Sequence, residues 1–450
     1  MNTTTELNKD ALGLGESVVM GIAGTAPAFS VTATTSTLIA TVGVLSAASL
    51  LYCGLIMFGI TIAFMHLNRV ITNAGASYAW VGKVFHPVLG FLAGWALLVA
   101  SVIFMVSGTI PAATATLTLI APQFVNHTGT VTFVAAGWLL LVGAVIVKGI
   151  KPTSYTQVVM TTIEVGVLVA VIFAALLQYS HQPLHNFSWQ WFSLGEFTPT
   201  LFATGALISL FFFWGWDVTL NLNEETRNST SVPGHGAIAA MIIVLLLFIS
   251  FAVAVLLVMS DAEIQQAGTN LLFALSEKLF PHPWSYLAVI AVMVSSIGTL
   301  ETSILQFTRT MYAKARDGAL QPHYAILHKS WRTPWVATSV IVGIGLALLF
   351  LSSFYSSINL IIKDSINAIG FQVAFYYGLA SFACVKHFWK RAIQGIIPFL
   401  GLFLWPAASA SFLIFIVCYS IPTFDFITIL IGIGGIVIGI VPMTLNQWRK

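Results

Sequence analysis

Three acidic residues stand inside long apolar stretches, where an ionised carboxylate is costly: Glu164, Asp217 and Glu301. An acid near the middle of a membrane helix costs about 2.5–3.5 kcal/mol even on the most lenient insertion scale. Acids at such depths are typical of proton relays and cation sites, because protonation changes their charge. For Glu164 and Glu301 the alternative is hydrogen bonding to Ser and Thr hydroxyls of neighbouring helices. All three are therefore candidates for proton or cation coupling.

Asp217 closes an aromatic segment that contains Phe211, Trp214, Gly215 and Trp216. No basic residue lies in the apolar stretches up to this point, so Asp217 is protonated, solvated in a cavity, or paired with a cationic ligand. Faces of the aromatic rings could stack on an ammonium group. The alternative is a neutral aspartate that caps a half-helix. We predict that these five residues contribute to a substrate-binding site.

A second interrupted segment lies near the amino terminus and ends at Pro27. Two glycines and a proline without an N–H group make local unwinding of a helix cheap there. Unwinding exposes backbone amides, and a half-helix amino terminus is a natural seat for a carboxylate. The alternative is that the glycines only permit close helix packing. The predicted binding residues of this segment are Gly21, Ile22, Ala23, Gly24, Thr25 and Ala26.

Composition indicates which solvent surrounds the elements that carry these residues. Of the 450 residues, 58% are apolar and only 7% are charged, and the mean hydropathy is +0.93. Soluble domains carry roughly 25% charged residues. At about 20 residues a span, the length accommodates about twelve membrane helices. The sequence thus predicts an all-α polytopic protein in the lipid bilayer. The net charge of +3 is too small to favour nucleic acid as a partner.

The distribution of basic residues predicts the orientation in the membrane. Of the 18 Lys and Arg residues, only Lys278 and Lys363 fall in segments on the opposite side from the amino terminus. Cytoplasmic loops carry an excess of Lys and Arg. We therefore expect both termini in the cytoplasm, an even number of spans, and a location in the cell membrane, either plasma membrane or bacterial inner membrane.

The two interruptions fall in the first and the sixth predicted spans. Inverted-repeat transporters place discontinuous helices at equivalent positions of their two halves, around a site near mid-membrane. We predict one transport domain over residues 1–450, in which 1–14 form a cytoplasmic tail. Residues 15–179 would form a first five-helix repeat, 201–385 a second inverted one, and 393–446 two additional helices.

Sequence motifs for other chemistries are missing. The segment from Gly75 to Lys83 has the wrong spacing for a P-loop, and Val84 stands where Ser or Thr would bind magnesium. No metalloprotease motif or hydrolase nucleophile elbow occurs, and Cys53, Cys384 and Cys418 are far apart. We expect no enzyme activity, cofactor, metal or nucleotide.

Several motifs in combination resemble the amino acid, polyamine and organocation superfamily of secondary transporters, over nearly the whole chain. The residues concerned are Met20 to Pro27, Asn73 to Trp80, Gly90 to Trp95, Gly215 to Asn228 with Pro233, Arg309 to Gly318, and Thr333 to Trp335. The resemblance implies a five-plus-five inverted repeat, alternating access, and substrate held between unwound parts of helices one and six. It also implies that Phe211 closes over the substrate and that Asp217 matches an acid of some amine exchangers.

The sequence departs from the superfamily pattern at two places. The first helix lacks the usual Gly-Ser-Gly-Ile-Phe type of sequence, so its carboxylate-binding glycines would be Gly21 and Gly24. A lysine that many proton-coupled members carry on helix five is replaced here, at the approximately matching position, by Glu164. An acid cannot imitate a bound cation, so this site would instead hold a proton or a cationic group.

Together these patterns predict a secondary transporter for an amino acid or related amine, working by proton coupling or exchange. Asp217 and the aromatic residues would recognise the ammonium group, and amides of the first helix any carboxylate. The main alternative is a transporter of polyamines or other carboxylate-free amines, in which Glu164 or Glu301 meets a second positive centre. A transporter-like sensor that binds an amine without moving it is a third hypothesis.

Overall fold

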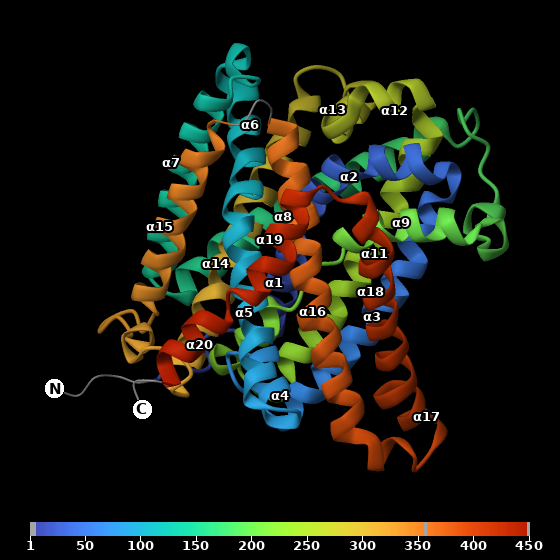
Figure 1. Ribbon diagram of the computed structural model, residues 1–450. Helices are drawn as coiled ribbons and strands as arrows, with labels where there is room; N and C mark the ends of the chain where they lie inside the picture. Colours follow the sequence, from blue (N-terminus) through green and yellow to red (C-terminus); the bar gives the residue numbers. More distant parts are fainter. Residues whose placement is uncertain (1–5, 355–357, 448–450) are drawn as a thin grey trace.

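The computed structural model describes the backbone of residues 6–354 and 358–447, and these side chains except 358–361, 363, 364, 427 and 445–447. The described part is a bundle of long helices (Figure 1). Its β pairing, within those residues, is one isolated bridge between Leu12 and Thr226. Part of the predicted 1–14 tail and the side chain of Lys363 lie outside the described residues.

The first set of membrane-crossing elements runs from the amino-terminal segment to residue 179. It comprises α1 (Leu14–Gly24), α2 (Pro27–Val42), α3 (Ser46–Val70), α5 (Pro87–Ser107), α6 (Thr109–Ile120), α7 (Thr128–Val147) and α8 (Ile150–Tyr179). The second set comprises α9 (Pro199–Phe211), α10 (Val218–Asn221), α11 (Val232–Val258), α14 (Leu287–Arg316), α15 (Trp335–Ser352) and α16 (Ile358–Ala392). In each set the first crossing is the broken one, as the sequence predicts.

The remaining helices follow the two sets or lie at the ends of the bundle. They are α17 (Ile396–Phe399), α18 (Trp405–Ser420), α19 (Phe426–Val437) and α20 (Ile440–Gln447), and the short α4 (Ser77–Val84), α12 (Asp261–Ala267) and α13 (Leu271–Leu279). Figure 1 shows α12 and α13 at one end of the bundle and α4 at the other.

The number of crossings agrees with the predicted twelve. Nine segments of the described chain are long and apolar enough to span a bilayer, and the first of them covers Leu14–Val70. Its 57 residues exceed one crossing of about 20, and Gly43, at φ +58°, turns the chain between α2 and α3. The shorter apolar helices Pro199–Phe211 and Thr428–Thr444 complete the set. The inversion of the second repeat relative to the first remains a prediction.

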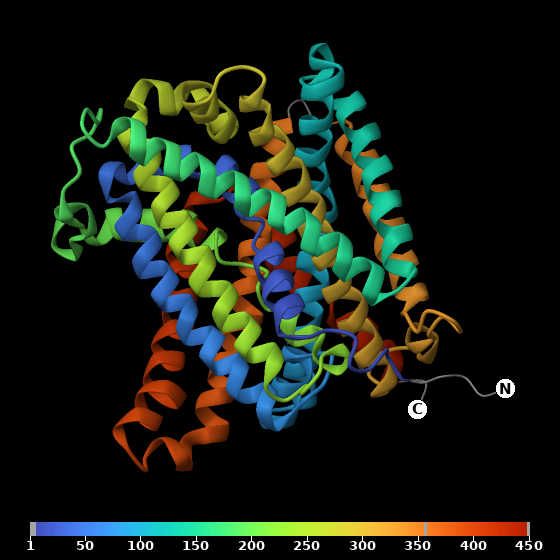
Figure 2. The same cartoon turned by 180° about the vertical axis from the view of Figure 1, so that it is seen from behind.

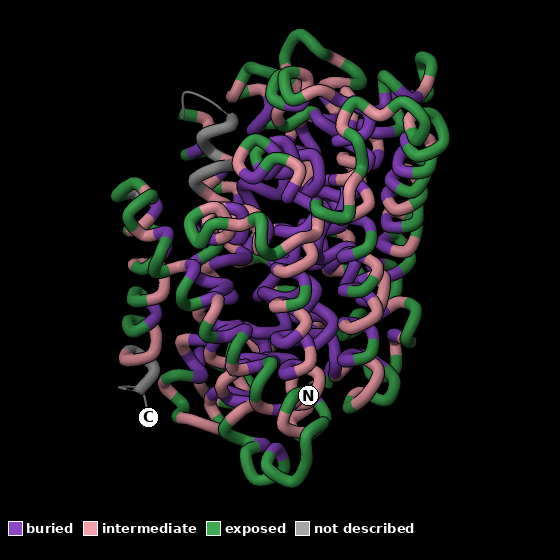
Figure 3. The backbone as a smooth tube through the Cα atoms, turned by 90° about the vertical axis from the view of Figure 1, so that its right-hand side faces the viewer, coloured by how far each residue is buried: buried purple, intermediate pink, exposed green. Residues whose placement is uncertain are grey.

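The buried residues gather along the middle of the bundle, and the exposed ones lie at its ends and on its outer helices (Figure 3). The core helices pack α16 against α5, α11 against α3 and α1, and α14 against α8 and α6. The break between α1 and α2 lies inside this core, and Figure 2 shows it from the rear of the bundle. The tertiary structure therefore buries both helix breaks, residues 25–26 and 212–217, within the protein.

Candidate functional site

The first helix break is shorter than the sequence predicts. Helix α1 continues through Gly24, and the chain leaves helical geometry only at Thr25 and Ala26, which has φ 47° and ψ 63°. Pro27 then starts α2, since proline has no N–H group to lose and its φ suits the first helical position. Unwinding thus follows Gly24 instead of beginning at Gly21, which corrects the expected location of free amides.

The second break separates α9 from α10. Helix α9 ends at Phe211, and the chain turns through Phe212 to Asp217 before α10 begins at Val218. Gly215 has φ +103°, a backbone conformation that residues with a side chain rarely adopt. Glycine is therefore required at this position by conformation alone.

The two breaks touch each other through backbone atoms. A Cβ on Gly24 would overlap the carbonyl oxygen of Gly215, and a Cβ on Gly215 would overlap that of Gly24. Gly21 serves packing instead, because a Cβ there would lie 2.6 Å from that of Ala240 in α11. Close approach of small residues is a common way to pack membrane helices. Gly24 and Gly215 therefore permit the two breaks to cross, whereas Gly21 permits α1 to pack against α11.

Polar groups of the first break are mostly satisfied within the protein. The Thr25 hydroxyl donates to the Ile22 carbonyl at 2.7 Å, and the Thr299 hydroxyl of α14 donates to the Ala23 carbonyl at 2.6 Å. The amides of Thr25 and Ala26 donate to the Ile22 and Ala23 carbonyls. Participation of the residues from Gly21 to Ala26 in substrate binding remains a prediction. The backbone amides of Thr25 and Ala26 are not free to bind a substrate carboxylate, because they already donate within the protein.

Asp217 lies at the crossing of the breaks and is held by two tyrosines of α16. Its side chain is buried, and its Oδ1 accepts from the Tyr377 hydroxyl at 2.8 Å and its Oδ2 from the Tyr376 hydroxyl at 3.1 Å. The Tyr376 oxygen in turn accepts from the Trp214 indole N–H at 3.0 Å. A hydrogen-bonded chain thus runs from Trp214 to the carboxylate.

A mainly apolar cavity of about 500 Å³ is lined by Trp214, and Asp217 is not among the residues that line it. Phe211 and Trp214 line it together with residues of α2, α16 and α18. The Phe211 ring lies 6.5 Å, centroid to centroid, from Phe29 in the first turn of α2. Volumes of about 300–1,000 Å³ are usual for small-molecule sites. Two predicted binding residues therefore line one cavity, and hydrogen bonds through Tyr376 connect Asp217 to one of them, Trp214.

Trp216 has a different position from the other aromatic candidates. It is fully buried and packs against Phe64, at 5.3 Å between ring centroids, and Tyr377, at 5.5 Å. Its indole N–H has no partner among the described residues. Trp216 does not line the cavity, and a direct contact with substrate remains a prediction.

Glu164 and Glu301 both lie at the interface of α8 with α14, apart from Asp217. The Ser295 hydroxyl and the backbone amide of Ala28 face the buried carboxylate of Glu164. Glu301, also buried, accepts from the Thr156 hydroxyl at 3.3 Å. With its amide nitrogen turned to Glu301, Gln157 donates to Oε2 at 2.7 Å. The hydroxyl contacts expected as one alternative therefore exist, and a coupling role remains a prediction.

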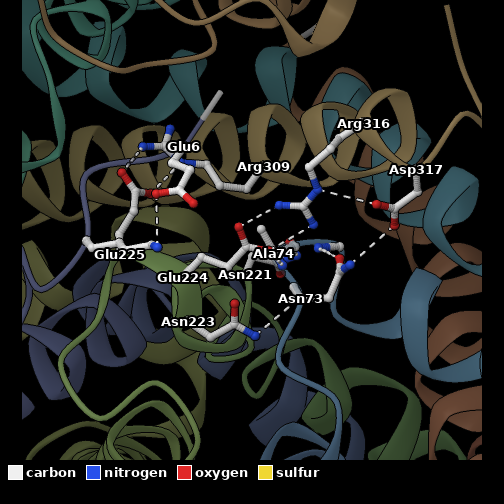
Figure 4. Close-up of polar contacts among 12 residues, drawn as sticks. Glu6, Asn73, Ala74, Asn221, Asn223, Glu224, Glu225, Arg309, Arg316 and Asp317 are labelled. Carbon is white, nitrogen blue, oxygen red and sulfur yellow. Dashed lines mark hydrogen bonds and ion pairs between the residues drawn. The ribbon is translucent and has the colours of Figure 1, made fainter. Parts of the chain in front are cut away.

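A cluster of polar residues, here called the Arg309 cluster, closes the bundle at the end of α14. It consists of Asn73, Glu224, Glu225, Arg309 and Arg316 (Figure 4). Arg309 and Glu225 form a buried bidentate ion pair with N–O distances of 2.8 and 3.0 Å. Arg316 binds both oxygens of Glu224 at 2.7 and 3.0 Å. These links join the segment after the second break to α14.

The sequence alone did not assign Tyr376, Tyr377 and Ser295 to the site. The tyrosines lie about 160 residues after Asp217, so no local pattern connects them. In the sequence the two tyrosines stand in an apolar stretch, where they could line a cavity or pack, and the fold brings both hydroxyls to the Asp217 carboxylate. Ser295 lies in a segment of α14 rich in Ser and Thr, but the sequence does not show which side chain it meets.

Comparison with known proteins supports the same class of protein. A family model described as amino acid permease matches residues 13–443. The chain is 24% identical to the serine/threonine exchanger SteT of Bacillus subtilis over 72% of this chain and 70% of that protein. It is 22% identical to the human b(0,+)-type amino acid transporter 1, over 83% and 75% of the two chains. The low-affinity putrescine importer PlaP of Escherichia coli is 23% identical over 73% and 70%. With its broken helices and twelve crossings, the chain belongs to the amino acid permease family of membrane secondary transporters.

Proposed function

We propose that this permease moves an amino acid across the cell membrane, with its ammonium group directed to Asp217. The observation that carries the proposal is the chain from the cavity through Trp214 and Tyr376 to the Asp217 carboxylate. A buried carboxylate with a tyrosine on each oxygen attracts a cationic group while the aromatic rings provide its apolar surroundings. Two of the relatives named above are an exchanger or a transporter of amino acids.

Alternating access requires one end of the site to open while the other is closed. The cavity lies on the α9 side of Trp214, and the Arg309 cluster holds the opposite end shut through a fully buried ion pair. For substrate to leave past this cluster, the links between the 223–225 segment and α14 must separate. The cluster is therefore proposed as the gate on that side, and Phe211 with Trp214 as the lid over the substrate.

Proton coupling is proposed for the buried acids Glu164 and Glu301, which accept few hydrogen bonds and are not among the residues that line the cavity. Such acids bind protons readily in a medium of low dielectric constant. Asp217 remains a third candidate because hydrogen bonds through Tyr376 connect it to Trp214, which lines the cavity. Protons would then accompany the amine substrate, and no nucleotide would be needed.

Uptake by proteoliposomes tests the function. Purified protein is first screened for thermal stabilisation by amino acids and by amines, since ligand binding to the folded state raises apparent stability. Labelled L-serine is then offered with an imposed proton gradient, or against internal unlabelled serine. We expect accumulation above equilibrium in one of these arms. Diamine uptake without any amino acid uptake would favour the polyamine alternative, and saturable binding without accumulation would indicate a sensor.

The orientation can be tested by cysteine labelling in intact cells. Cys53 and Cys384 are buried and Cys418 is exposed, so a Cys418→Ser background removes the accessible thiol. In that background, Glu263→Cys, which lies on α12, should react with a membrane-impermeant maleimide. Arg391→Cys, near the end of α16, should react only after permeabilisation. The opposite pattern would place the termini outside the cell.

A further inference from the structure

The first turn of α2 presents donors that no helical carbonyl can satisfy. Pro27 has no N–H, the Phe29 amide donates to the Ser295 hydroxyl at 3.2 Å, and the Ala28 amide faces Glu164. A helix amino terminus carries the equivalent of about half a positive charge. A carboxylate of the protein itself therefore faces the helix end at which a substrate carboxylate would be expected.

Glu164 faces the amino terminus of α2, but only part of its carboxylate is hydrogen-bonded. Its side chain is 1% exposed, and its Oε2 atom has no hydrogen-bond partner among the described residues. No ion pair of Glu164 occurs within the same residues. A buried carboxylate oxygen without a donor is costly, and either a proton or a new donor removes that cost. The unpartnered oxygen thus points to a group that binds a proton during function.

The α2 end is also close to the cavity. Phe29, in its first turn, packs edge-on against Phe211, which lines the cavity. The crossing of Gly24 with Gly215 lies immediately before this turn. A substrate whose ammonium group is directed to Asp217 would therefore have its carboxylate near the same turn.

We propose that Glu164 and the substrate carboxylate compete for the amino terminus of α2, so that a substrate carboxylate binds only when Glu164 takes up a proton. The inference rests on the proposed function and adds its coupling step. Two carboxylates near one buried helix end repel each other, and the end can compensate only one of them. The proton enters with the substrate, converts the Glu164 carboxylate to the acid, and leaves when the substrate leaves. No covalent bond forms or breaks in the substrate.

Few charged groups on the helices that pack against α8 can interfere. Glu301 of α14 follows Ser295 by six residues, about 9 Å along the helix axis. Arg309 is paired with Glu225, and Lys314 lies over the Phe91 ring at 3.7 Å. The others lie at helix ends: Glu16 of α1, His235 of α11, Glu277 and Lys278 of α13, and Arg316 of α14. In the part of the chain that the structure describes, none of them forms an ion pair with Glu164, and the groups that face its carboxylate are the α2 end and Ser295.

Proton uptake on ligand binding tests the competition. Binding of L-serine and of ethanolamine, which lacks only the carboxylate, is measured by calorimetry in buffers of different ionisation enthalpy. At a pH at which Glu164 is ionised in the free protein, the wild-type protein should take up about one proton with serine and none with ethanolamine. Glu164→Gln should bind serine with no linked proton and with a Kd that does not change with pH. Glu164→Asp keeps a carboxyl group and should retain the proton uptake. It therefore shows whether the Gln variant loses proton uptake because the carboxyl group is missing. Glu263→Gln, at a partly exposed acid of α12 outside the crossings, should bind serine and the linked proton as the wild type does.

The outcomes separate this inference from the function on which it rests. Serine binding with no proton uptake in the wild type, or with undiminished uptake in Glu164→Gln, would overturn the competition and leave the amino acid transporter intact. Ethanolamine binding without serine binding would overturn both. If serine gives no thermal stabilisation, the calorimetry uses another pair of ligands in place of serine and ethanolamine. These are the amino acid that stabilises the protein most and the amine formed by its decarboxylation. Absence of binding by every amino acid would reject the proposed function itself.

Discussion

Gly24 and Gly215 cross with their backbones in contact, each occupying the space that a Cβ of the other would need. This contact fixes the two helix breaks against one another, and Asp217 follows it by two residues. It also means that neither residue can acquire a side chain without moving the other break. The position of the candidate site thus depends on two glycines that lie 191 residues apart in the sequence.

Substitution of Gly215 by alanine should abolish transport. Besides the overlap with Gly24, φ +103° lies in a region that costs a residue with a Cβ about 1–2 kcal/mol. We expect uptake to fall at least tenfold and the apparent melting temperature to drop. Gly137→Ala on α7, where an added Cβ meets open space, is the matched control. Equal uptake by the two variants would contradict the proposed contact.

The tyrosines on Asp217 can be removed one hydroxyl at a time. Tyr377→Phe deletes a 2.8 Å bond to the carboxylate, and a hydrogen bond to a charged group contributes about 1.5–3 kcal/mol. If this bond orients Asp217 for the ammonium group, the KM for serine should rise about tenfold or more. Asp217→Asn should lower uptake further at unchanged membrane insertion. The exposed Tyr155→Phe serves as control, and wild-type KM in Tyr377→Phe would reject this role.

Filling the cavity should block uptake without unfolding the protein. Ala33 and Ala374 line it from α2 and α16, so an Ala374→Trp side chain would occupy much of the 500 Å³. Because the cavity already offers the volume, we expect a small change in melting temperature and a loss of serine binding. Val159→Trp, on the exposed face of α8, provides the comparison. Serine uptake that survives in Ala374→Trp would locate the substrate elsewhere.

Breaking the buried ion pair of the Arg309 cluster should lower the stability of the protein, because it leaves one charge buried without a partner. The side chains of Arg309 and Glu225 are 0% and 1% exposed. Removing one partner of such a pair destabilises by about 3–5 kcal/mol, because the other charge stays buried. Glu225→Gln is therefore expected to unfold at lower denaturant or temperature. Glu6→Gln, which breaks an exposed pair with Lys9, should change stability by less than about 1 kcal/mol.

The short helix α12, outside the crossings, should respond to acid. The hydrogen bond from Lys278 lowers the pKa of Glu263 to about 2, from a usual value of 4.5. A lowered folded-state pKa contributes stability above pH 4.5 that is lost as the pH falls toward 2. Protection of the α12 amides, measured by hydrogen exchange and corrected for intrinsic rates, should therefore decrease over this range. The pair is partly exposed, so the effect is local and small. In Lys278→Gln most of this pH dependence should disappear, and its persistence would contradict the assignment.

The sequence by itself determined the class of protein and the number of crossings. Apolar composition requires that backbone groups be satisfied within helices in the bilayer, and the uneven distribution of Lys and Arg predicts the orientation. The Gly and Pro residues near Pro27 and Gly215 predicted both breaks, because these residue types alone make unwinding cheap. Asp217, Glu164 and Glu301 were recognisable because a charge in an apolar segment is expensive wherever the fold places it.

Only the tertiary structure decided which groups these residues meet. Helix geometry limited the first break to Thr25 and Ala26, and packing against α11 gave Gly21 a different role from that of Gly24. Tyr377 reaches Asp217, and Glu164 faces Ala28, across more than a hundred residues of chain. Such contacts depend on how whole helices pack, and no local pattern specifies them. For that reason the three acids could be recognised in the sequence as candidates, but their partners could not.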